Sequence, residues 1–188
     1  VTVVKNENNT LPLNVTKKSK VLLVAAENNQ RSLMKYGAER AKNAGLIPDG
    51  AEVKVTRYMD RTLASDATVI NADGSTYTSS MTDLLDWCDT LVVVSDNSGL
   101  NVAKAHYNNN YTGTPYNLVD YVEKDKKRSL VFRPHPLTFK NFISLGLITS
   151  DEVDEYLRKF QNNEQLYYDQ TSEYFTTFWH SDVFVGDI

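Results

Sequence analysis

Cysteine, long apolar runs and clustered positive charge are all scarce in this 188-residue chain. The single cysteine, Cys88, excludes an intramolecular disulfide and a cysteine-rich zinc site. The longest apolar run, Val21–Ala26, has six residues, far short of the roughly 18 that a membrane-spanning helix needs, so we expect no membrane segment. A net charge of −4 is unlike the basic excess of nucleic-acid-binding proteins, so nucleic acid is not an expected partner.

The motifs that bind nucleotides or carry out common catalysis are missing as well. No glycine-rich dinucleotide or phosphate loop, no G-x-S-x-G nucleophile elbow and no H-E-x-x-H zinc motif occurs. The three histidines, His106, His135 and His180, show no ligand spacing. We therefore expect no metal ion and no other cofactor.

What the chain does have is an alternation of strand-like and helix-like segments. Val21–Ala26, Leu91–Val94 and Ser129–Phe132 are typical of buried strands. Helices are predicted over about 32–44, after the capping residue Ser80, and from Pro115 to about 126. This alternation predicts one domain over residues 1–188 of the α/β class, a three-layer α/β/α sandwich with a mainly parallel sheet and a flavodoxin-like topology.

Three finer expectations concern the region after the first buried strand. The first helix should face the sheet with small and apolar residues at helical spacing, which are Leu33, Gly37, Ala41 and Ala44. The alternating stretch Glu52–Met59 predicts a half-exposed strand at an edge of the sheet. The polar stretch Asp60–Thr78 is expected to be a long loop that holds a turn or an irregular hairpin. Cys88, on an apolar helix face, is expected to pack in the core.

Candidate binding residues follow the three buried strands. In open parallel sheets, ligands bind outside the carboxyl ends of the strands, where the strand order reverses. The loops at that end offer the polar residues Glu27, Asp96, Asn97, Ser98, Arg133 and His135. His135 lies between two prolines, and a hydrogen-bonded turn residue is the favoured role for it over a catalytic one. Because the spacing of these residues specifies no reaction, we assign no catalytic residue.

The opening of the chain carries the most specific signal. A short β-rich segment, an Asn-rich turn and the sequence Leu11-Pro12-Leu13 precede the first buried strand. This order resembles the "LLKN…LPL" opening of the second domain of glycoside hydrolase family 3. The ending, Asp182–Ile188, resembles the "VLFGD" segment near the end of such domains. The strands Val21–Ala26 and Leu91–Val94 and the helix start at Thr114 also fit, although such elements are common to α/β layers.

The resemblance implies a C-terminal domain whose partner is an N-terminal (β/α)8 catalytic barrel of the same protein, and the lack of an initiator Met fits a fragment. In the family, the nucleophilic Asp belongs to the barrel. In glucosidase-like members the second domain lends an acid Glu within Glu-x-x-Asp-Arg, but the matching interval here, from Val94 to Pro115, holds neither Glu nor Asp-Arg. The resemblance therefore points to bacterial enzymes acting on β-N-acetylhexosaminides, with an isolated domain that is inactive.

A second hypothesis explains the same alternation without an enzyme. A free-standing flavodoxin-like binding or interaction domain would also lack a catalytic set. Carbohydrate is a further ligand class that the first hypothesis leaves open, and a composition rich in Asn, Thr, Tyr and Asp favours a secreted or cell-surface bacterial protein. The aromatic-rich tail Tyr167–Phe184 is expected to cover the sheet.

Overall fold

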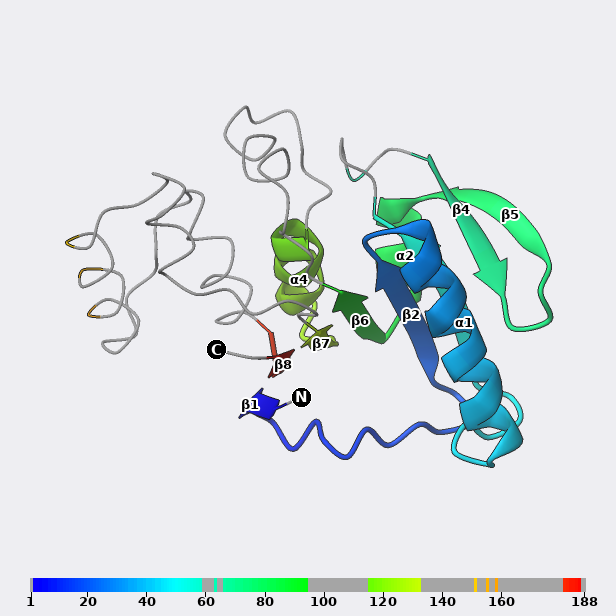
Figure 1. Cartoon of the computed structure of the whole chain (residues 1–188), viewed down its shortest axis with the longest axis horizontal. Helices are drawn as coiled ribbons and strands as arrows, with labels where there is room; N and C mark the ends of the chain where they lie inside the picture. The colour runs from blue at the N-terminus through cyan, green and yellow to red at the C-terminus, as the bar shows by residue number, and fades with distance from the viewer. Residues whose placement is uncertain are drawn as a thin grey trace.

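The structure is an open, mixed β-sheet with helices on both faces (Figure 1). The computed structural model describes residues 2–58, 63, 66–94, 115–132, 151, 155, 158 and 181–186. The strands are β1 (Thr2–Asn6), β2 (Lys20–Ala25), β3 (Glu52–Arg57), β4 (Asp66–Asn71), β5 (Thr76–Ser80), β6 (Thr90–Val94), β7 (Arg128–Phe132) and β8 (Val183–Gly186). The helices are α1 (Asn28–Asn43), α2 (Met81–Trp87) and α4 (Pro115–Lys124).

The sheet has eight strands in the order β1-β8-β7-β6-β2-β3-β4-β5. Its centre, β3-β2-β6-β7-β8, is parallel throughout. Numbered along the chain, these strands have the spatial order 2-1-3-4-5, which is the flavodoxin-like order. Antiparallel strands extend both sides, β1 beside β8 and the β4–β5 hairpin beside β3. The predicted α/β class with a mainly parallel sheet and flavodoxin-like topology is confirmed.

Two apolar clusters, one on each face of the sheet, define the three layers. The face under α2 and α4 holds the larger cluster, which includes Leu22, Val24, Leu84, Leu85, Leu91, Val93, Leu118, Val122 and Val131. The face under α1 holds Val21, Val53, Val92, Leu130, Val183 and Val185. Because successive residues of β2, β6 and β7 enter opposite clusters, these strands carry uninterrupted apolar runs after their first residues, as their sequences predicted.

Helix α2 forms where the sequence predicted it, and for the predicted reason. The hydroxyl of Ser80 accepts a hydrogen bond from the amide of Asp83 at 3.1 Å, which caps the first turn. Met81, Leu84 and Leu85 are buried on the sheet side. The apolar stripe at helical spacing therefore provides the packing energy of this short helix.

Helix α1 presents a different face to the sheet from the one predicted. Leu33 is 68% exposed, and a side chain at Gly37 would meet open space. The residues that pack against the sheet cluster are Met34 and Ala38 instead. The stripe of Leu33 with small residues fits helical spacing, but Met34 fills the space above β2 and β3 better than Gly37 can. The helix is therefore rotated by about one residue, roughly 100°, relative to the prediction.

The prediction that 52–59 forms an edge strand is wrong, because a hairpin follows it. Strand β3 lies between β2 and β4, and β4–β5 continues the sheet beyond it. The hairpin turn is closed by Asp73, whose carboxylate accepts hydrogen bonds from the amide and hydroxyl of Ser75 at 2.9 and 2.6 Å. These bonds lower the pKa of Asp73. Gly74 adopts a φ of +84°, a conformation that glycine adopts without strain.

Candidate functional site

The strand order reverses between β2 and β6, so the predicted binding site belongs at the carboxyl ends of these two strands. On the β2 side the structure describes the loop that leads into α1. Glu27 is exposed there and is the N-cap residue of the helix. The side-chain oxygen of Gln30 accepts hydrogen bonds from the amides of Ala26 and Glu27 at 3.0 and 3.2 Å. Those amides are therefore not available to a ligand, and Glu27 offers an exposed carboxylate.

The other predicted site residues fall outside the described part of the chain. They are Asp96, Asn97, Ser98, Arg133 and His135. The crevice as a complete binding site therefore stays a prediction that rests on the strand order and on Glu27. Most of the aromatic-rich tail, 167–180, also lies outside the described residues.

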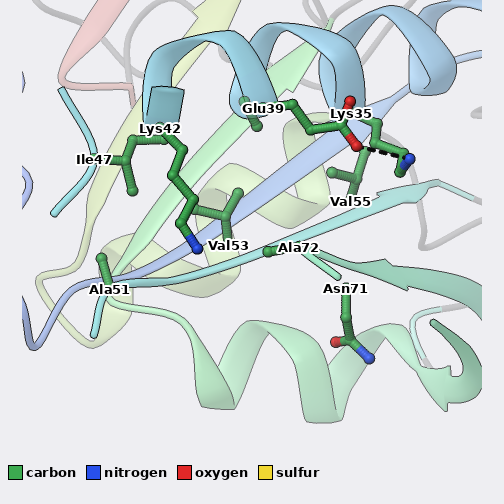
Figure 2. Close-up of a pocket in the computed structure, with 10 residues that line it drawn as sticks. Lys35, Glu39, Lys42, Ile47, Ala51, Val53, Val55, Asn71 and Ala72 are labelled. Atoms are coloured by element: carbon green, nitrogen blue, oxygen red, sulfur yellow. Dashed lines mark ion pairs between the residues drawn. The ribbon is translucent and has the colours of Figure 1, made fainter. Parts of the chain in front are cut away.

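A groove that the sequence did not predict lies between α1 and the strands β3 and β4 (Figure 2). It is open to solvent, and its empty space of about 430 Å³ includes part of that solvent. Its apolar surface comes from Ala38, Ile47, Ala51, Val53, Val55 and Ala72, and its polar groups are Lys35, Glu39, Lys42 and Asn71. The groove exists because the hairpin extends the sheet past α1, so that β4 has no described helix above it on that face. The sequence did not predict the groove, because a hairpin within 60–78 was not expected to join the sheet beside β3.

The charges along the groove are largely neutralised by one another. Figure 2 shows Lys35 and Glu39 paired across one turn of α1, with 2.8 Å between the ammonium nitrogen and the carboxylate oxygen. Lys42 extends its side chain over Val53. Glu39 is the single carboxylate in the lining, whereas glycoside hydrolysis normally needs two flanking the scissile bond. The groove can accommodate a small apolar group, but it holds no acid and base pair.

Cys88 is a core residue, as the sequence predicted. It is 2% exposed, and its thiol donates a hydrogen bond to the carbonyl of Leu85 at 3.4 Å. Burial raises the pKa of the thiol to about 11. Because the thiolate is the nucleophilic form, this residue is inert at neutral pH.

Neither a metal site nor a membrane-spanning helix is found in the described part of the chain. In those residues, no three His, Cys, Asp or Glu side chains are grouped to hold an ion. None of their helices is both long and apolar enough to cross a bilayer.

The Asn-rich turn and the Leu11-Pro12-Leu13 sequence at the start of the chain attach this segment to the sheet. Asn6 closes the turn before Leu11 from both sides, because its amide nitrogen donates to the Leu11 carbonyl and its oxygen accepts from the Leu11 amide, at 3.3 and 3.0 Å. Leu11 and Leu13 then pack against the cluster under α1. The Asn turn thus directs two leucines onto the sheet.

Asp182 joins this opening to the end of the chain. One carboxylate oxygen accepts from the side-chain amide of Asn8, and the other accepts from the backbone amide of Ser129, each at 2.8 Å. The carbonyl of Asp182 also accepts from the amide of Glu7 at 2.9 Å. Asp182 therefore connects β1, β7 and β8 at the same end of the sheet.

Comparison with known proteins shows a distant likeness to a solved structure. No protein-family model matches the chain, and no curated protein does. Among solved structures, a chain with a TM-score of 0.40 and 19% identity is described as "A unique GCN5-related glucosamine N-acetyltransferase region exist in the fungal multi-domain GH3 beta-N-acetylglucosaminidase". The match covers 70% of this chain and 12% of that one. The description concerns an acetyltransferase region, not the C-terminal domain of the glycosidase, and a likeness of this size carries no activity to this chain.

Proposed function

We propose that this chain is the C-terminal, non-catalytic α/β-sandwich domain of a β-glycosidase similar to glycoside hydrolase family 3. The parent enzyme would hydrolyse O-glycosyl bonds of β-N-acetylhexosaminides, with this domain packed against its catalytic barrel. The observation that carries the proposal is the meeting of the two segments on which the family resemblance rests. Strand β1 of the opening pairs antiparallel with β8 of the ending, Thr2 opposite Gly186 and Val3 opposite Val185.

The contacts of Asn6 and Asp182 support the proposal further. Both residues belong to the resembling segments, and both form hydrogen bonds that hold these segments to the sheet. The residues that carry the resemblance therefore act together in the fold, because they hold the two ends of the chain to the sheet. Two short motifs 174 positions apart, from Asn8 to Asp182, meet in one corner of the fold.

The carboxylates of the described residues support a non-catalytic role. The groove holds one carboxylate, Glu39, and the described loop of the crevice holds one, Glu27. Two carboxyl groups about 5–10 Å apart are needed for either stereochemical course of glycoside hydrolysis. The nucleophile and the acid are accordingly expected on the barrel.

The test is to read the gene upstream of the codon for Val1 and to express both the complete product and the present chain. We expect an upstream (β/α)8 barrel of about 250 residues. The complete product should turn over a chromogenic β-N-acetylglucosaminide, while the isolated chain gives background rates. Absence of a barrel contradicts the proposal. So does turnover by the isolated chain that is lost in Glu27→Gln and kept in the matched control Glu39→Gln.

The strand order favours a second candidate, a free-standing flavodoxin-like binding domain. The strand order reverses between β2 and β6, and folds of this topology bind ligands at such a point. Titration of the chain with a flavin, a nucleotide and N-acetylglucosamine separates the two candidates. Micromolar affinity for the flavin or the nucleotide favours the second, whereas no binding of either favours the glycosidase domain.

A further inference from the structure

Strand β5 is the outermost strand of the sheet on the hairpin side, at the right of Figure 1. In the described part of the chain, β4 is the sole strand that pairs with it. Thr76, Tyr77 and Thr78 are all exposed, and Tyr77 keeps 37% of its surface in contact with solvent. An edge strand presents unpaired N–H and C=O groups that are a template for another strand.

The hydrogen bonds of the hairpin show which groups of β5 point outward. The amide of Asn71 donates to the carbonyl of Ser75 at 2.9 Å and its carbonyl accepts from the amide of Gly74 at 2.9 Å, so Asn71 bonds across to the β5 side at the turn end of the hairpin. In antiparallel pairs, hydrogen-bonded and non-hydrogen-bonded positions alternate. Tyr77 and Ser79 therefore bond to β4, while Thr76 and Thr78 direct their N–H and C=O groups away from the sheet.

Strand β5 also lacks the features that protect exposed edges. Natural edges are protected by lysine, by proline or by a bulge. The segment Thr76–Ser80 contains none of these residues and no charge, and its pairing with β4 runs without a register shift. The opposite edge strand, β1, has both a register shift between Val3 and Lys5 and a lysine.

We propose that β5 pairs antiparallel with β5 of a second copy of this chain, on a two-fold axis between the two Tyr77 residues. Thr76 of one copy then lies opposite Thr78 of the other, and each such pair exchanges the outward N–H and C=O bonds. The two Tyr77 residues form the non-hydrogen-bonded pair between them. The sheets of the two copies join into one continuous sheet.

The sequence of the strand favours a second copy over a different peptide. Thr76-Tyr77-Thr78 reads the same in both directions, so a two-fold axis places threonine opposite threonine and tyrosine opposite tyrosine. Such pairs are favourable in antiparallel sheets, and no like charges meet across the axis. An isologous interface of this kind closes as a dimer and does not grow into a filament.

The side chain of Tyr77 is already positioned for this pairing. The ammonium of Lys54 lies 5.3 Å from the centre of the Tyr77 ring and 4.1 Å from that of Trp87. This cluster holds the tyrosine on the face of the sheet that α2 covers. The ring therefore has one side against Lys54, and 37% of the residue stays exposed to solvent.

Sedimentation equilibrium up to about 1 mM protein, a concentration at which even weak complexes form, tests the dimer. We expect the mass to rise with concentration from 21.3 kDa toward twice that value. The double variant Thr76→Lys, Thr78→Lys should weaken association at least tenfold with an unchanged circular dichroism spectrum. The matched control Ser32→Lys, Asn43→Lys adds the same charge on the exposed side of α1 and should dimerise as the unchanged chain does. A chain that stays monomeric throughout, or a control that weakens association equally, overturns the proposal.

Disulfide trapping tests the register. Residues of a non-hydrogen-bonded pair have Cα atoms about 4.5 Å apart, within the range that a disulfide spans. Under mild oxidation, Tyr77→Cys should therefore form a covalent dimer, while Ser79→Cys, on the same face of the same strand, should stay monomeric. Buried Cys88 does not compete, because its thiol stays protonated. Equal crosslinking of the two variants, or of neither, overturns the proposed axis.

Discussion

The two edges of the sheet are built in opposite ways. The β1 edge is irregular and closely tied to the rest of the fold: its register shifts between Val3 and Lys5, and Lys5 has only 11% of its side chain exposed and pairs with Glu7 at 3.3 Å. The β5 edge is regular, uncharged and exposed. The edge formed by the two ends of the chain is therefore protected against further pairing, while the edge added by the hairpin is open to it.

The two edge strands also differ in the sequence separation of the residues that hold them, which is long for β1 and short for β5. Strand β1 is held by β8 and Asp182, at the other end of the chain, and depends on completion of the whole sheet. The β4–β5 hairpin is held by its own turn, through Asp73 and Ser75, and by the cap of α2. Local contacts of this kind form early and at low entropic cost, whereas the β1–β8 pair closes nearly the entire chain.

The largest effect is expected from proline in β5. Tyr77→Pro removes the amide that bonds to β4 and leaves the carbonyl of its buried partner Val69 without a donor. The free energy of unfolding should therefore fall by about 3 kcal/mol. Thr78→Pro removes an outward amide, which an edge strand tolerates, and should cost less than about 1 kcal/mol. Urea unfolding of both variants measures the difference. Equal losses would show that the inward and outward assignment is wrong.

Asp182→Ala is the corresponding test of the β1 edge. The change removes the acceptor of the Ser129 amide and of the Asn8 side chain, and hydrogen bonds to a charged group contribute about 1.5–3 kcal/mol each where buried. Because Asp182 is half-exposed, we expect a loss of about 2 kcal/mol in the free energy of unfolding, measured by urea titration. The exposed Asp151→Ala is the control and should change stability by less than about 0.5 kcal/mol. Dimer formation through β5 should survive in both, since the two edges are independent.

The sequence predicted those parts of the fold in which local pattern and tertiary role agree. Buried parallel strands need apolar residues on both faces, so Val21–Ala26 and Leu91–Val94 were recognisable by composition alone. The stripe of Met81, Leu84 and Leu85 behind the Ser80 cap predicted α2 in the same way. From the order of these elements, the flavodoxin-like topology followed.

Features that depend on a neighbour were missed. The face of α1 depends on which side chain best fills the space above the sheet, and periodicity could not separate Met34 from Leu33. The hairpin has a polar second strand, β5, and a first strand, β4, that alternates polar with apolar residues, and the Asp73-Gly74 turn signal lies between them. A hairpin within 60–78 was one of the expected forms, but its pairing with β3 was not predicted, so β3 was expected at an edge and the groove beside β4 was not foreseen. Of the predicted crevice, Glu27 alone lies in the described residues.

Amide hydrogen exchange, followed residue by residue at low and high protein concentration, tests the contrast between the two edges most directly. In dilute protein, we expect fast exchange at Thr76 and Thr78, and slow exchange at Tyr77 and at Glu7 beside the β1 edge. At high concentration Thr76 and Thr78 should become protected, while Glu7 stays protected throughout. Slow exchange at Thr76 and Thr78 in dilute protein would contradict the open β5 edge. Exchange at these residues that does not depend on protein concentration would contradict pairing through β5.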